Sequence, residues 1–229
     1  MTAAEVVERP QKLADPKFAH GAAGFGIQSK VMYGITTPVL QKLARSIGRD
    51  QQLSLELWRT GIMEARIIAA FIGEPAKVTS AQMESWLKDF DSWAVCDCCC
   101  CYLFDKTKDA YKKAIVWSRR KAEYEKRAAF ALMAYLAVHD KPAPDDAFLK
   151  FLPIIARESW DERNFVKKAV NWALRQIGKR NRALNESAIH TAREIREQGT
   201  RAARWIAADA LRELESEAVH RRLASRVIL

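Results

Sequence analysis

The stretch EKRAAFALMAYLA (residues 125–137) predicts a helix, and four other stretches of the chain can be aligned with it. They are EARIIAAFIG (64–73), WAVCDCCCCYLF (93–104), FVKKAVNWALRQIG (165–178) and AARWIAADALREL (202–214). One column of the alignment holds Arg66, Asp97, Arg127, Lys168 and Arg204, at separations of 31, 30, 41 and 36 residues. Repeats of about this length, each a helical hairpin, are typical of HEAT-like solenoids.

The remaining sequence also favours helix. Only 9 Gly and 7 Pro are present, which is few for the turns of an all-β fold, and no alternating pattern is long enough for a strand. Thr37 is predicted as an N-cap with Pro38 at the first helical position, while Gly73 and Gly199 predict helix ends. Further helices are expected at 52–58, 61–73, 80–89, 92–104, 107–119, 123–139, 145–157, 162–179, 184–198 and 200–215, with Ser80, Ser92, Asp145 and Asp161 as caps.

These patterns predict an all-α fold, a superhelical solenoid of HEAT-like helical hairpin repeats. Its inner helices would line a basic concave groove with one cation per repeat, and Asp97 would be the lone acid of that column. We expect a single domain over residues 1–229, with residues 1–17 as a flexible or peripheral N-terminal segment.

The charge balance indicates the kind of partner. With 38 Lys and Arg against 28 Asp and Glu, the formal net charge is +10, which favours nucleic acid first and an anionic membrane surface second. No apolar run approaches the roughly 20 residues that cross a bilayer, and the N-terminus lacks the apolar segment of a secretory signal. We therefore expect a cytoplasmic protein with reduced thiols that does not enter a membrane.

A basic stripe is the first candidate site. Residues 163–182 contain seven cations and no acid, and within them Lys168, Trp172, Arg175 and Lys179 share one helical face. Such a stripe suits a groove that follows a nucleic-acid backbone, because cations neutralise phosphates while the ring contacts base or sugar. The alternative is a solvated basic face with Trp172 turned into the core.

The second candidate site lies on the cysteine-rich helix. Trp93 and Asp97 are four residues apart and share a face, and a curved solenoid would bring Trp172 and Arg127 to the same carboxylate. An ionised acid between two indoles would attract a cation. The alternative is a structural Asp–Arg pair with two core tryptophans.

The five cysteines fall within residues 96–101. Four thiolates of one continuous helix cannot easily face one tetrahedral metal, since neighbours lie about 100° apart around the axis. Packing as small buried hydrophobes is therefore favoured over metal or redox chemistry, and we expect neither a metal nor a cofactor.

Five segments together resemble the AlkD-type DNA alkylation repair glycosylases, which have HEAT-like repeats. They are YGITTPVLQKLAR (33–45), EARIIAAFI (64–72), FDSWAVCD (90–97), NFVKKAVNWALRQIGKRN (164–181) and ARWIAADALREL (203–214), so the similarity spans about residues 18–225.

This resemblance implies a monomeric DNA glycosylase, a hydrolase of base excision repair. It would excise N3- or N7-alkylated purines, which are cationic, from double-stranded DNA without flipping the base. The family's pocket tryptophans match Trp93 and Trp172, and its essential aspartate matches Asp97. Its phosphate-contacting arginine matches Arg127. The DNA-binding residues would be Phe25, Thr36, Arg66, Lys167, Lys168, Arg175, Lys179, Arg180 and Arg204, although Phe25 and Thr36 replace the Tyr and Gln of better-known members. Two alternatives stay open: a non-catalytic HEAT-repeat protein that binds distorted or branched DNA, and a scaffold for an acidic protein.

Overall fold

A computed structural model describes residues 1–27 and 29–225 of the chain. Over these residues the structure is helical and contains no strand, so the prediction of an all-α fold is confirmed. The chain forms two compact units, Met1–Asp109 and Ala110–Leu229. The expectation of a single domain stays a prediction.

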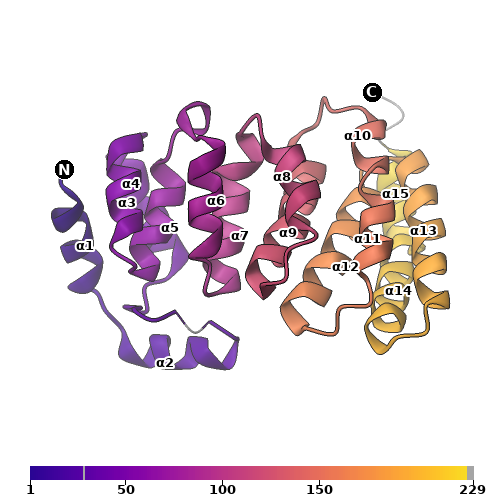
Figure 1. The fold of residues 1–229 in the computed structure, drawn as a ribbon, viewed down its shortest axis with the longest axis horizontal. Helices are drawn as coiled ribbons and strands as arrows, with labels where there is room; N and C mark the ends of the chain where they lie inside the picture. Colours follow the sequence, from indigo (N-terminus) through magenta and orange to yellow (C-terminus); the bar gives the residue numbers. More distant parts are fainter. Residues whose placement is uncertain (28, 226–229) are drawn as a thin grey trace. The chain divides into compact units, whose positions relative to one another are not determined.

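The first unit runs from α1 to the short helix η2 (Figure 1). Helix α5 lies at its centre, because it packs against α3, α4 and α7, and α1 also contacts α4 and α5. The elements are α1 (Ala3–Gln11), α2 (Pro16–Gly24), α3 (Thr37–Ile47), α4 (Gln51–Arg59), α5 (Met63–Ile72), η1 (Pro75–Lys77), α6 (Ser80–Lys88), α7 (Trp93–Tyr102) and η2 (Phe104–Lys106).

Stacked aromatic rings fill the core of the first unit. The rings of Trp58 and Trp86 lie parallel with their centroids 3.9 Å apart, and the edge of Phe90 meets Trp58. The Trp58 indole N–H donates to the Asp89 carboxylate at 2.8 Å, so the polar edge of a buried ring is satisfied. This packing joins α4 to α6 and to the turn that leads into α7.

A buried glutamate holds the segment that precedes α3. The Glu64 carboxylate oxygen Oε1 accepts backbone N–H groups from Tyr33, Gly34 and Ile35 at 2.9, 2.8 and 3.2 Å. Gly34 has φ +81°, and a Cβ there would lie 2.3 Å from the carbonyl oxygen of Asp15, so only glycine fits this turn. The approach to α3 is thereby fixed against the first turn of α5.

The second unit consists of helical hairpins. Helix α8 packs against α9, α11 against α12 and α13 against α14, while α9 and α14 also pack against α12 (Figure 1). The elements are α8 (Ala110–Trp117), α9 (Glu123–His139), α10 (Asp145–Leu149), α11 (Leu152–Glu158), α12 (Asn164–Gly178), α13 (Arg182–Glu197), α14 (Arg201–Leu214) and α15 (Glu217–Ala224).

Small residues set the spacing of these helices. Helix α9 buries nearly every side chain from Lys126 to Ala137, which fits its Ala-rich sequence. At the end of α12, a Cβ on Gly178 would lie 2.7 Å from a methyl of Leu214 and 2.9 Å from the Cβ of Ala188. A larger residue at position 178 would therefore push α12 away from α13 and α14.

Several expected helix boundaries are confirmed and others are wrong. The helix expected at 123–139 is α9 with both ends correct, and Gly73 is the C-cap of α5. The helix expected at 145–157 is two helices, because Pro153 lies in the first turn of α11 and cannot donate within a continuing helix. The N-cap residue of α3 is Thr36 rather than Thr37, and the hydroxyl that caps α6 belongs to Thr79 rather than Ser80. The N-cap residues of α10 and α12 are Pro144 and Arg163 rather than Asp145 and Asp161.

Candidate nucleic-acid interface

The first turn of α7 presents Trp93. Ser92 is the N-cap residue of α7, and the Trp93 indole N–H donates to the backbone carbonyl oxygen of Phe25 at 3.0 Å. Nearby, the Ser29 hydroxyl donates to the Asp91 carboxylate at 2.9 Å. The structure therefore brings two predicted site residues together, and it leaves the Phe25 side chain 77% exposed.

Asp97 lies one turn further along α7 and is half-buried. The neighbouring sulfurs are in apolar surroundings: Cys96, Cys99 and Cys100 are fully buried. Burial is the main cause that raises the pKa values of the Cys98, Cys99 and Cys100 thiols, and the negative charge of Asp97 adds to the effect at Cys98 and Cys100. These thiols are packing groups beside a charged carboxylate.

Arg127 and Trp172 lie in the second unit. Arg127 is 7% exposed, and one of its guanidinium nitrogens donates to the carbonyl oxygen of Phe165 at 2.7 Å. The edge of Tyr135 meets the half-buried Trp172 ring with centroids 4.8 Å apart. Both predicted residues therefore sit on the packed pair α9 and α12, each with a defined orientation.

Acids of α14 partly neutralise the basic stripe on α12. Arg175 forms ion pairs with Asp209 at 3.1 Å and Glu213 at 2.7 Å, and Lys179 pairs with Glu213 at 2.5 Å. Asn171 also donates to Asp209, at 2.6 Å. These contacts give Arg175 and Lys179 a structural role that competes with the predicted DNA contact.

Arg180 and Arg66 are likewise engaged within their own units. The Arg180 guanidinium lies 4.0 Å from the centroid of Phe148 and donates to the carbonyl oxygens of Ala137, Asp140, Lys141 and Ala143. The Arg66 side chain is 13% exposed, lies over the Trp58 ring at 5.0 Å and donates to the Asp89 carbonyl oxygen at 3.0 Å. Both arginines hold helices together.

Other predicted residues are open to solvent. Lys168 and Arg204 are exposed, and so is Thr36, the N-cap residue of α3. Lys167 lies over the ring of Trp205 at 5.1 Å, and Trp205 is 39% exposed. Sequence reasoning missed Trp205, although its place directly after Arg204 in ARWIAADALREL marks it as a ring beside a cation.

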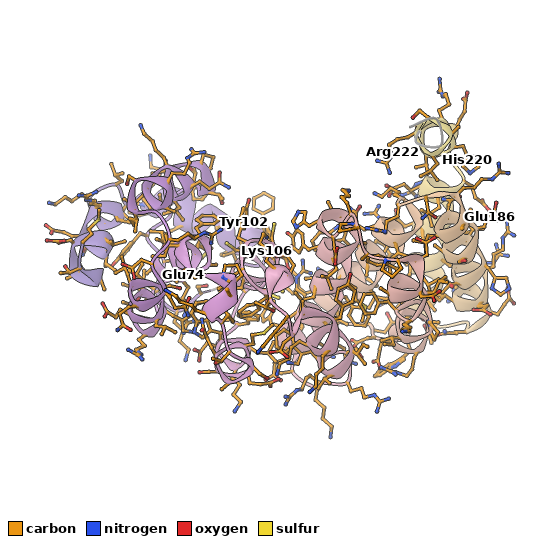
Figure 2. All side chains as sticks on the ribbon, turned by 90° about the horizontal axis from the view of Figure 1, so that it is seen from above. Glu74, Tyr102, Lys106, Glu186, His220 and Arg222 are labelled. Atoms are coloured by element: carbon orange, nitrogen blue, oxygen red, sulfur yellow. The ribbon has the colours of Figure 1, made fainter. Side chains whose placement is uncertain are left out.

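A basic pocket of about 310 Å³ lies at the C-terminal ends of α9 and α12, and its lining includes Lys141, Lys179, Arg180 and Arg222. Arg222 comes from α15 and donates to the Lys179 carbonyl oxygen at 3.2 Å. Figure 2 shows Arg222 and His220 on opposite sides of α15. No helix was predicted for this segment, so sequence reasoning missed Arg222.

The fold is shared with a known group of proteins. A solved structure described as "A new family of proteins related to the HEAT-like repeat DNA glycosylases with affinity for branched DNA structures" matches this chain with a TM-score of 0.75 at 19% sequence identity. The match covers 85% of this chain and 83% of the other. It shows that this chain has the HEAT-like fold of that group.

The sequence defines the family. A family model described as DNA alkylation repair enzyme matches residues 7–214, and the chain therefore belongs to the DNA alkylation repair enzyme family. The resemblance stated from the five sequence segments is thereby confirmed. None of the curated proteins compared with the chain matches it. In residues 1–27 and 29–225, no helix is long and apolar enough to cross a membrane.

Proposed function

We propose that this protein is a DNA glycosylase that hydrolyses the N-glycosidic bond of N3- or N7-alkylated purines in duplex DNA. The observation that carries the proposal is the pair Trp93 and Asp97 on α7, an oriented indole and a half-buried acid one helical turn apart, in a chain of the DNA alkylation repair enzyme family.

The chemistry needs few groups. Alkylation at N3 or N7 makes the purine cationic, so the base is already a good leaving group. The enzyme then has to stabilise the positive charge that develops on the deoxyribose and to place a water molecule. The Asp97 carboxylate supplies the charge, and the Trp93 indole face attracts the cationic base or sugar. We propose the same kind of contact for Trp172, and a phosphate contact for Arg127; these two roles rest on the family resemblance.

The proposed DNA contacts follow from exposure. Lys168, Arg204 and the Lys167–Trp205 pair are accessible on α12 and α14, and the basic pocket at Arg222 and Lys141 suits a phosphate group. Lysine and arginine side chains contribute salt-dependent affinity that does not depend on DNA sequence.

A base-release assay tests the catalytic proposal. Duplex DNA that contains 7-methylguanine is incubated with the protein, and the free base is measured by chromatography. We expect Asp97→Asn to lower the excision rate about 100-fold or more, because one stabiliser of developing charge is lost, while duplex affinity changes little. Asp146→Asn, which alters an exposed acid on α10, serves as the control and should keep the wild-type rate. Equal excision by Asp97→Asn and the wild type would refute the proposed role.

A second candidate function is binding of branched DNA without catalysis. The solved structure that shares this fold belongs to proteins described as having affinity for branched DNA structures. Affinity for a four-way junction is compared with affinity for a duplex of equal length. No base release together with tighter junction binding would favour this second function over the glycosylase.

A further inference from the structure

A pocket of about 490 Å³ lies in the first unit, and neither Trp93 nor Asp97 lines it. Its lining includes Gln41 and Arg45 from α3, Arg49 from the following turn, Phe71 from α5 and Tyr102 from α7. Tyr102 is nine residues beyond Trp93 on the same helix, so the Cα atoms of the two residues lie about 14 Å apart along the helix axis. The volume lies within the range of about 300 to 1,000 Å³ that is usual for small-ligand sites.

Two aromatic rings form one wall of this pocket. The edge of one ring meets the face of the other between Phe71 and Tyr102, with centroids 4.6 Å apart and an interplanar angle of 89°. Tyr102 remains 38% exposed, although large aromatic side chains are usually more buried than this (Figure 2). The pair therefore offers a rigid aromatic surface to a planar group.

Polar groups line the other side. The Gln41 side-chain amide donates to the Tyr102 hydroxyl oxygen at 3.0 Å, which fixes the ring and leaves the hydroxyl hydrogen to donate elsewhere. Burial, followed by the nearby Cys101, raises the pKa of the Tyr102 phenol, so the hydroxyl stays protonated at neutral pH.

The charge of the pocket is positive. Arg45 lies one turn after Gln41 on α3 and is exposed, while Arg49 donates to the carbonyl oxygens of Phe71 and Gly73. None of the lining residues, all of which fall in the described part of the chain, is acidic. A ligand that is planar at one end and anionic at the other fits these walls.

We propose that this pocket binds one unpaired nucleotide of a DNA strand, with the base against Tyr102 and Phe71 and the phosphate beside Arg45. An aromatic platform next to arginine is the combination that holds single-stranded nucleic acid. A base in a duplex is stacked on both faces and cannot reach such a platform, so the pocket selects frayed, flapped or branched ends. This inference deepens the proposed function, since both involve DNA, but it does not require base excision.

Fluorescence anisotropy with a short labelled thymidine oligonucleotide tests the assignment on the full chain. We expect Tyr102→Ala to weaken binding about ten-fold and Tyr102→Phe to change it less than two-fold, because stacking depends on the ring. Arg45→Gln should lower the slope of log affinity against log salt by about 0.7, the value for one phosphate of a single strand. Arg59→Gln, an exposed arginine at the end of α4, removes the same charge and should leave the slope unchanged.

A measurement on the wild-type protein does not depend on variant folding. An oligonucleotide that carries 5-iododeoxyuridine is photocrosslinked, and the attached peptide is mapped by mass spectrometry. A crosslink at Tyr102 or Phe71 supports the proposal, and crosslinks found only at other residues overturn it. Equal changes for Arg45→Gln and Arg59→Gln would also overturn it. In the base-release assay, Tyr102→Ala should release the alkylated base from duplex DNA at the wild-type rate. Failure of the proposed nucleotide site can therefore be distinguished from failure of the proposed glycosylase activity.

Discussion

The indole N–H of Trp93 donates a hydrogen bond of 3.0 Å to the backbone carbonyl oxygen of Phe25, which lies 68 residues earlier in the chain. The bond links the first turn of α7 to the segment that follows α2. It orients the indole, so the position of the Trp93 side chain on α7 depends on a backbone segment far away in the sequence.

Trp93→Phe should loosen this segment while keeping an aromatic ring on α7. The lost hydrogen bond is exposed and contributes about 0.5 to 1.5 kcal/mol, which is enough to raise local opening but small beside global stability. Hydrogen exchange measured by mass spectrometry should become several-fold faster in peptides that cover residues 22–27. Trp205→Phe, a change on the exposed surface of the second unit, should leave those peptides unaffected. Unchanged exchange in Trp93→Phe would show that other contacts hold the segment.

Arg180→Lys should lower stability although it keeps the charge. Lysine cannot reproduce the flat fork that donates to four carbonyl oxygens and lies on Phe148. We expect the free energy of unfolding in urea to fall by about 2 kcal/mol. Arg182→Lys, whose side chain is 84% exposed, should change it by less than about 0.5 kcal/mol. A variant with the wild-type free energy of unfolding would show that the structural role is wrong, and would leave the charge of Arg180 on DNA as its main contribution.

Glu213→Gln should strengthen DNA binding. Glu213 pairs with both Arg175 and Lys179, so its removal makes these cations more available to phosphates. The slope of log affinity against log salt for duplex DNA should steepen by up to about 0.9 for each phosphate gained. Glu186→Gln removes an acid that is 68% exposed on α13 and serves as the charge-matched control. Identical titrations for the two variants would exclude Arg175 and Lys179 from the DNA interface.

Asp161 should make stability depend on pH in the acid range. Burial alone would raise the pKa of this carboxyl, but hydrogen bonds from Arg163 and Lys126 outweigh burial and the net pKa is lowered. A carboxyl with a lowered folded-state pKa stabilises the fold fully above its unfolded pKa of about 3.9 and loses that contribution as pH falls through the folded value. Urea unfolding between pH 5 and pH 3 should therefore show a shallower loss of stability in Asp161→Asn than in the wild type. Asp146→Asn should lose as much stability between pH 5 and pH 3 as the wild type does. If Asp161→Asn also loses as much, a group other than Asp161 causes the loss of stability in acid.

The sequence predicts the helical fold well because its signals are local. Both ends of helix α9 are predicted correctly, since a charged first turn is followed by an uninterrupted run of apolar and aromatic residues from Ala128 to Val138. The split between α10 and α11 depends on Pro153, which lies in the first turn of α11 and interrupts an otherwise helical pattern. The short helices α1 and α15 lack a long apolar face; α1 packs against α4 and α5, and α15 packs against α13 and α14.

The candidate site was only partly predictable. Arg66 and Lys168 occupy the same column of the repeat alignment, yet Arg66 is half-buried over Trp58 while Lys168 is exposed. Spacing places a residue on a face of its own helix, whereas the partner that covers it comes from another helix. In the same way, the neutralisation of Arg175 by Asp209 requires the packing of α12 against α14 and could not be inferred from either segment alone.

The burial of three sulfurs on α7 bears on how easily electrophiles can modify this helix. Electrophiles attack thiolates faster than thiols, and burial raises the pKa of the Cys99 and Cys100 thiols, which disfavours their thiolate form. The helix that carries Asp97 is therefore less open to covalent modification at these two positions than it would be with solvent-exposed cysteines.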